Sequence, residues 1–194
     1  MSPFRGGLPV SDQTTQAVAL VYTGTMPDSV PPLRNAFESA MLEASGQAAT
    51  PLCYAFAPGR YSFLTAGAAG ILGSAGTEAF MEGVAKWARA HLGTSHISSP
   101  QLRVYAAGCN RAVVRDETAG DWRYCFSLSE SVRAGHMDVF DGILARRSGP
   151  RRLARFGFEP GALLVHSARC YYSIRPRGNP DLLAGLVFLD GYLW

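Results

Sequence analysis

Residues 158–176 read FEPGALLVHSARCYYSIRP, and this stretch decides the fold. The Pro160-Gly161 pair predicts a turn, because proline and glycine interrupt regular structure more strongly than other residues. The apolar residues Ala162–Ser167 and the aromatic-rich residues Tyr171–Arg175 predict two short strands, with three residues between them. The stretch therefore predicts that the second half of the chain is built from short strands.

The chain around this stretch places helices first and strands later. Leu33 and Phe37 share one face of a predicted helix, and Phe80 and Val84 share the inner face of a second helix that we expect Thr77 to cap. Further strands are predicted at residues 17–22, 53–56, 61–64, 102–106, 122–129, 136–140 and 183–189. This order predicts an α+β fold in which helices pack on a β-sandwich or barrel.

The composition of the chain narrows its class. With 194 residues, 47% of them hydrophobic, residues 17–194 suit one domain behind a flexible arm at residues 1–16. A formal charge of +3 is too small to predict nucleic-acid binding, and we expect no membrane segment. None of the four cysteines forms a Cys-x-x-Cys pair, so neither a zinc site nor a redox pair is predicted. A cytoplasmic protein with reduced thiols is the expectation.

Five segments carry a resemblance to a known family. They are RVYAAG at residues 103–108, DWRYCFSLS at 121–129, AGHMDVF at 134–140, the stretch 158–176, and LAGLVFLD at 183–190. In this order they resemble the 2-oxoglutarate/Fe(II) oxygenases, close to the prolyl-hydroxylase-like branch. The resemblance implies a double-stranded β-helix core, also called a jelly roll and shared with cupins, supported by N-terminal helices.

The positions that matter most in that family differ here. The family holds iron with a His-x-Asp or His-x-Glu pair and a distal histidine. The resemblance places these on Val114-Arg115-Asp116 and on Tyr172, so only the carboxylate is kept. The family's arginine for 2-oxoglutarate falls on Asp181 or the residue after it. The resemblance therefore implies a degenerate member that has no metal and no cofactor.

The barrel mouth is the predicted site. Asp116 is expected to act as a general acid or base and Tyr172 to steady an oxyanion. Family positions predict that the substrate pocket is lined by Tyr105, Val114, Arg123, Cys125, Ser127, Met137, Arg175 and Asp181. We therefore expect a metal- and 2-oxoglutarate-independent enzyme that cyclises, isomerises or eliminates on a small organic substrate, in specialised metabolism. Two alternatives stay open: a non-catalytic oxygenase-like protein that binds a ligand or a partner, and a metal-dependent oxygenase with unusual ligands.

Two other groups of residues are candidate binding sites. His136, Asp138 and His166 form a shifted candidate for a metal triad. If Met137 faces the barrel interior, strand alternation turns His136 and Asp138 away from it. Residues Arg146–Arg155 hold five arginines and are expected to form a solvated loop or a dock for an anion or an acidic carrier protein. A homodimer is a further possibility for the partners.

Overall fold

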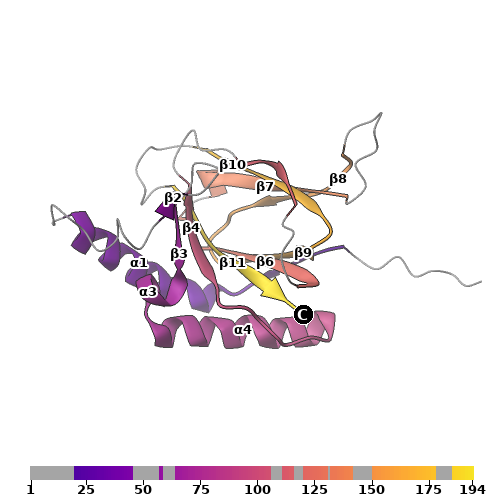
Figure 1. Ribbon diagram of the computed structural model, residues 1–194. Helices are drawn as coiled ribbons and strands as arrows, with labels where there is room; N and C mark the ends of the chain where they lie inside the picture. The colour runs from indigo at the N-terminus through magenta and orange to yellow at the C-terminus, as the bar shows by residue number, and fades with distance from the viewer. Residues whose placement is uncertain are drawn as a thin grey trace, which may run out of the picture.

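Two antiparallel sheets face each other and form a flattened barrel in the computed structural model (Figure 1). The structure describes residues 20–45, 57–58, 64–105, 111–115, 120–130, 132–141, 150–177 and 185–194. The larger sheet has the order β1-β9-β6-β11-β4-β3-β2, and the smaller sheet has the order β5-β10-β7-β8. The expected α+β jelly-roll architecture is thus the observed one.

The strands of the larger sheet are β1 (Val21–Thr25), β2 (Ala57–Pro58), β3 (Leu64–Gly67), β4 (Gln101–Tyr105), β6 (Trp122–Ser127), β9 (Ala162–Ser167) and β11 (Leu186–Leu193). Those of the smaller sheet are β5 (Arg111–Val114), β7 (Gly135–Phe140), β8 (Arg152–Gly157) and β10 (Tyr171–Pro176). The helices are α1 (Val30–Ser45), α3 (Ala68–Leu72) and α4 (Ser74–Leu92), with 3-10 turns at Pro27–Ser29 and Val132–Ala134.

The strand predictions were accurate for β9 and β10, whereas β1 (Val21–Thr25) shares only two residues with the strand predicted at residues 17–22. Strand β9 has the predicted bounds, and β10 extends one residue beyond its prediction, to Pro176. The prediction of a loop at Arg146–Arg155 was wrong in its second part, because Arg152–Gly157 form strand β8. The arginine-rich sequence gives no apolar pattern that would predict this strand. It forms because β8 pairs with β7, and this pairing satisfies its backbone hydrogen-bonding groups.

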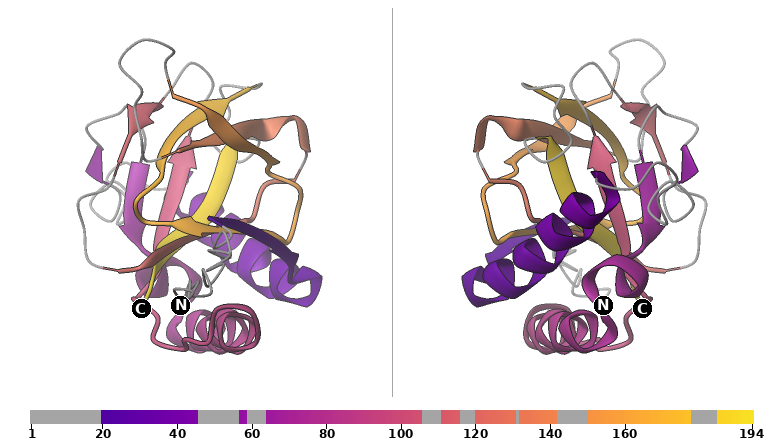
Figure 2. Two further views of the ribbon diagram at one scale, coloured as in Figure 1. Left: turned by 90° about the vertical axis from the view of Figure 1, so that its right-hand side faces the viewer. Right: turned by 90° about the vertical axis from the view of Figure 1, so that its left-hand side faces the viewer.

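Two hydrophobic cores lie on the two faces of the larger sheet. Tyr124 and Phe126 on β6 face the helices and pack with Phe80 and Val84 of α4. Cys125, between them, faces the smaller sheet and packs with Met137 and its neighbours. Side chains of a strand point to alternate faces, so one strand serves both cores. Figures 1 and 2 show α1 and α4 on one side of the larger sheet, with the smaller sheet on the other side.

The start of α4 differs from the prediction. Helix α4 begins at Ser74, and Thr77 lies inside its first turns, where its hydroxyl donates to the Gly73 carbonyl over 2.8 Å. Thr77 is therefore not the cap. No helix in the described ranges has both the length and the apolar character needed to cross a membrane.

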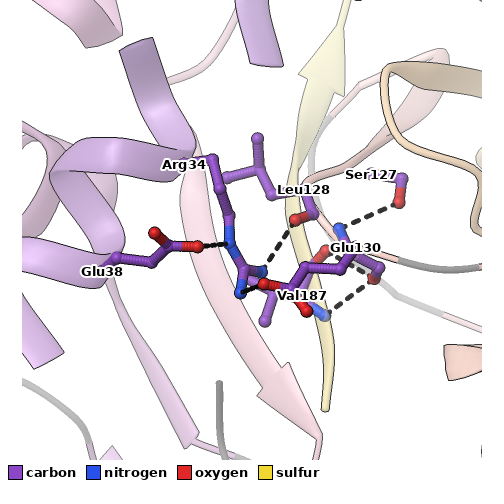
Figure 3. A network of polar contacts seen from close by, with 7 residues as sticks. Arg34, Glu38, Ser127, Leu128, Glu130 and Val187 are labelled. Carbon is purple, nitrogen blue, oxygen red and sulfur yellow. Dashed lines mark hydrogen bonds and ion pairs between the residues drawn. The ribbon is translucent and has the colours of Figure 1, made fainter. Parts of the chain in front are cut away.

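Helix α1 is tied to the end of β6 by a buried arginine (Figure 3). Arg34 is 7% exposed and donates to Glu38 at 2.6 Å, to the Leu128 carbonyl at 3.0 Å and to Glu130 at 3.0 Å. Because one guanidinium serves three acceptors from two elements, it fixes the position of α1 on the sheet.

Candidate functional site

A row of polar side chains crosses the inner face of the larger sheet at one end of the barrel. His166 on β9 lies opposite Arg123 on β6 in the strand register. Asp190 on β11 follows in the row and is bound by Arg123 and, from β4, by Arg103. Four adjacent strands therefore contribute one polar group each to the same side of the sheet.

The carboxylate of Asp190 joins the two guanidinium groups. Arg103 Nε donates to Asp190 Oδ1 at 2.6 Å, and Arg123 Nη2 donates to Asp190 Oδ2. Arg123 and Asp190 are only 1% and 3% exposed. Burial is the largest single effect on Arg103 and lowers its pKa, but the charge and the hydrogen bond of Asp190, with a smaller effect of Tyr105, together raise the pKa above its usual value. Both arginines are cations in the folded protein, and Asp190 holds them in place.

The smaller sheet covers this row with an aromatic ring. The Arg123 guanidinium carbon lies 4.1 Å from the centroid of the Tyr172 ring, within the range of a cation–π contact. The His166 ring lies 5.7 Å from the Tyr172 ring, and its Nδ1 is 2.9 Å from the Ser167 carbonyl oxygen. Tyr172 is therefore packed against a cation and an imidazole, all three being buried.

Several of the predicted lining residues share this interior. Val114 is paired with Tyr172 across the strands, and its side chain packs against the inner core. Tyr105, Cys125 and Met137 are buried in that core. Ser127 is buried further along β6, where its Oγ accepts from the Ser129 backbone N–H over 3.3 Å.

Other predicted site residues lie elsewhere. Arg175 is exposed and lies opposite His136, on the outer face of the smaller sheet, so its prediction as a pocket residue was wrong. Strand alternation explains this, because Tyr172 and Ile174 occupy the inward positions of β10. Asp116, Asp181, Arg146–Gly149 and the arm at residues 1–16 lie outside the described residues.

The centre of the barrel is filled by aromatic side chains. Phe188 stacks on Tyr105 with ring centroids 5.7 Å apart, and on Phe158 with centroids 5.2 Å apart. All three side chains are 0% exposed. Space for a ligand must therefore be sought at the end of the barrel near Arg123 and Tyr172, beyond this aromatic layer.

Sequence reasoning missed Arg103 and Asp190 as members of the site. A signal was present, since Asp190 ends the apolar run LVFLD and a carboxylate is rarely buried without a cation. His166 was considered above as a metal ligand, and its place beside Arg123 follows from the pairing of β6 with β9.

The candidate triad of His136, Asp138 and His166 is not assembled. Met137 and Val139 face the inner core, so His136 and Asp138 lie on the outer face of the smaller sheet. His166 lies on the inner side of the larger sheet, beside Tyr172. A sheet thus separates His166 from the other two residues.

The described residues do not fit the iron that the fold family implies. No three histidine, cysteine, aspartate or glutamate side chains within the described ranges are grouped so that they could hold a metal ion. Tyr172, which the sequence resemblance aligns with the family's distal histidine, lies against the Arg123 guanidinium, whose positive charge disfavours a divalent cation nearby. The side chains of the described residues therefore offer no suitable set of ligands for Fe(II).

A surface cavity of about 380 Å³ lies outside the barrel, near the start of α4. Small residues line it, together with Glu78 and Met81. Glu78 is its single charged lining residue, so this cavity lacks the converging polar groups of the Arg123 end.

The chain was compared with known proteins. No protein-family model and no curated protein matches it. Its structure is similar to a prolyl-4-hydroxylase from Pseudomonas putida, with 13% identity and a TM-score of 0.56 over 91% of this chain and 93% of that one. It is also similar to the alpha-ketoglutarate-dependent epimerase SnoN from nogalamycin biosynthesis, with 14% identity and a TM-score of 0.60 over 89% and 77% of the chains. The alpha-ketoglutarate-dependent carbocyclase SnoK, from the same biosynthesis, matches at 13% identity and a TM-score of 0.53 over 82% and 73%.

These findings contradict the prediction of a metal- and 2-oxoglutarate-independent acid/base enzyme. That prediction linked cyclisation and isomerisation to a barrel without iron, yet the carbocyclase and the epimerase of this fold are both alpha-ketoglutarate dependent. It named Arg123 as a substrate-lining residue but missed Arg103, which shares Asp190 with Arg123 inside the barrel. Because every identity is below 25%, the likeness concerns the fold: this chain has the double-stranded β-helix of the 2-oxoglutarate/Fe(II)-dependent oxygenases.

Proposed function

We propose that this protein binds a small organic carboxylate at the end of its barrel where Arg103, Arg123 and Tyr172 meet. The observation that carries the proposal is the row in which Asp190 orients two guanidinium groups inside an otherwise apolar barrel. Guanidinium groups bind carboxylates through paired, charge-assisted hydrogen bonds. A preorganised cation in a site shielded from water attracts an anion more strongly than one on the surface does.

A dicarboxylate with a 2-oxo group is the first ligand class to test. The solved structures of this fold include proteins named for their dependence on alpha-ketoglutarate, which is such a molecule. In this proposal the chain is a divergent relative in which Val114 and Tyr172 stand where the family's iron-binding histidines fall. Its ligand is held from the larger sheet rather than from the region of Asp181.

We also propose a single-domain organisation and a cytoplasmic location for this protein. Residues 17–194 form one domain in this proposal, and the protein is cytoplasmic. In the part of the chain that the structure describes, Cys125 and Cys170 are free thiols, which fits a reducing compartment. Neither the comparisons nor the described contacts support a carrier protein or a homodimer as a partner.

The test is calorimetric titration of the full chain with 2-oxoglutarate, succinate and pyruvate, each in the presence and in the absence of Fe(II) under anaerobic conditions. We expect a dicarboxylate to bind, and Arg103→Gln to weaken it at least tenfold in either condition. Arg123→Lys keeps the charge but loses the planar donor pair, so it should weaken binding as well.

The matched control is Arg89→Gln, an exposed arginine on α4, which lies on the opposite face of the larger sheet from the row. This variant should bind like the wild type. Thermal unfolding of each variant separates lost binding from lost folding. The proposal is overturned if no carboxylate binds in either condition, or if folded Arg103→Gln and Arg123→Lys bind as tightly as the wild type.

A further inference from the structure

The outer face of the smaller sheet carries a second group of charged side chains, separate from the barrel interior. In the register of β10, β7 and β8, His136 lies between Arg175 on one side and Gly157 on the other. Asp138, two residues along β7, lies between Ser173 and Arg155. Directly opposite residues share a face of a sheet, so these side chains lie on one surface. Figure 1 shows that this sheet is on the side of the barrel away from α4.

Positive charge exceeds negative charge on this surface. Arg155 binds Asp138 with two parallel hydrogen bonds, Nε to Oδ1 at 2.7 Å and Nη2 to Oδ2 at 2.9 Å. Arg152 also approaches Asp138, at 3.7 Å. Arg175 and Arg177 are exposed and form no ion pair with any residue in the described ranges. Four guanidinium groups thus lie on this part of the sheet, and Asp138 forms ion pairs with two of them, Arg152 and Arg155.

His136 stands among these cations. Burial lowers the pKa of His136, and Arg155, Arg177 and Arg175 lower it further, against an opposing effect of Asp138. Its Nε2 lies 3.6 Å from Asp138 Oδ2 and makes no hydrogen bond within the described residues. His136 is therefore a neutral group at pH 7 with three guanidinium groups close enough to influence it.

Gly157, which is exposed on the edge strand β8, leaves open space beside His136, and this space is called the Gly157 notch below. A Cβ atom built on Gly157 would meet nothing within 4 Å, and the φ angle of Gly157 does not lie in the left-handed region. The backbone therefore does not require glycine here, and its absence of a side chain leaves open space across from His136. A Cβ atom built on Gly135 would lie 2.6 Å from the Arg175 carbonyl oxygen, so glycine lets β7 and β10 approach closely beside His136. That close approach holds His136 next to Arg175.

A second buried polar group lies on the same face without a partner. Ser173 is 3% exposed, and its Oγ forms no hydrogen bond with any described residue. A buried hydroxyl without a partner is costly unless a ligand or water supplies one. It lies opposite Asp138 in the strand register, next to the arginine group.

We propose that this face binds the phosphate group of a small phosphorylated molecule, with Arg155, Arg175 and Arg177 as the cations and the Gly157 notch as the seat. Neighbouring strands are about 4.8 Å apart, so β10 and β8 place their arginines roughly 10 Å apart across β7. That span suits one phosphate or a diphosphate rather than an extended polymer. A phosphate dianion also matches the excess of guanidinium groups better than a single carboxylate does.

The experiment titrates the full chain with inorganic phosphate, pyrophosphate and glycerol phosphate, with acetate as the carboxylate control, at low ionic strength. Calorimetry gives the affinity, and backbone amide shifts of residues 135–138 and 155–157 report the place. We expect phosphate-bearing probes to bind and acetate to bind at least tenfold more weakly. Tighter binding of glycerol phosphate than of inorganic phosphate identifies an ester as the ligand, and the reverse identifies free phosphate or diphosphate; both support the site.

Variants separate a built site from general attraction by charge. The double variant Arg175→Gln and Arg177→Gln should weaken binding at least tenfold, and Gly157→Glu should abolish it by filling the notch with a carboxylate. Arg89→Gln together with Lys86→Gln removes two charges from α4 and should leave the affinity within twofold. The proposal fails if no phosphate probe binds at concentrations up to about 10 millimolar, beyond which binding is too weak to be specific. It also fails if the α4 variant loses as much affinity as the Arg175 and Arg177 variant. Neither result affects the carboxylate site at Arg123, which lies on the other side of the smaller sheet.

Discussion

The guanidinium group of Arg123 on the larger sheet lies over the ring of Tyr172 on the smaller sheet, 4.1 Å from its centroid. This contact joins the two sheets at the end of the barrel that holds the polar row. Asp190 binds the same guanidinium from β11. Arg123 therefore connects three strands: β6, β10 and β11. The stability of the site depends on Asp190, which neutralises the charge of Arg123.

Asp190→Asn should destabilise the fold strongly. Removing one partner of a buried ion pair leaves an uncompensated charge and costs about 3 to 5 kcal/mol. We expect a loss of that size in the free energy of unfolding, measured by urea denaturation. Asp121→Asn, at an exposed aspartate, should change it by less than about 0.5 kcal/mol. A loss below about 1 kcal/mol for Asp190→Asn would contradict the central place given to this carboxylate.

Phe188→Ala should open a cavity in the centre of the barrel. Phe188 stacks between Tyr105 and Phe158, so truncation removes both contacts and should cost about 3 to 5 kcal/mol. The cavity should admit an apolar probe such as benzene, which would raise the melting temperature of the variant and leave the wild type unchanged. Equal stability of the two proteins would mean that the aromatic layer is not tightly packed.

Arg34→Met should loosen α1 without unfolding the barrel. The substitution keeps most of the apolar stem but removes the donors to the Leu128 carbonyl and Glu130, so we expect a loss of about 1 to 2 kcal/mol. Hydrogen exchange of α1 amides should accelerate more than that of β9 amides. Glu130→Gln, at the more exposed carboxylate partner, is the control and should cost less than about 0.5 kcal/mol. Uniform acceleration in both elements would contradict a local role for Arg34.

His136 and Asp138 should make stability depend on pH with the same sign. The pKa of His136 is lowered, first by burial, and that of Asp138 is lowered, first by its hydrogen bonds from Arg155. In both cases the unfolded chain binds protons at a higher pH than the folded chain does, so stability rises with pH across each window. The unfolding free energy should therefore fall as pH drops below about 6.5, and again below about 4. His136→Gln should remove the fall in unfolding free energy that begins below about pH 6.5. An unchanged pH profile in this variant would contradict the assignment of that fall to His136.

Cys170 should resist alkylation in the folded protein. Burial, with a smaller effect of Asp141, raises the pKa of its thiol to about 11. At pH 8 the thiolate is therefore scarce as well as buried, and thiolate is the reactive form. Mass spectrometry after iodoacetamide treatment should find Cys170 unmodified in native protein and modified in urea. Rapid modification without denaturant would show that the β9–β10 turn opens readily.

The sequence alone determined the features that depend on neighbours along the chain. The apolar runs Ala162–Ser167 and Tyr171–Arg175 predicted strands that the structure contains, because strand formation follows local composition and the turns on either side. Alternation likewise predicted that His136 and Asp138 point outward if Met137 is buried. The α+β architecture followed from the order of these elements.

The tertiary structure decided which groups meet. Asp190 is 67 residues from Arg123 in the sequence and reaches it because β11 pairs with β6. Strand β8 forms from an arginine-rich segment because β7 offers its edge, and that pairing then places Arg155 opposite Asp138. Alternation along a strand predicts which face of the sheet a side chain occupies. Only the order and register of the strands determine which residue of a neighbouring strand lies next to that side chain. The charges in the barrel and on its outer face are therefore set by pairings that connect distant parts of the chain.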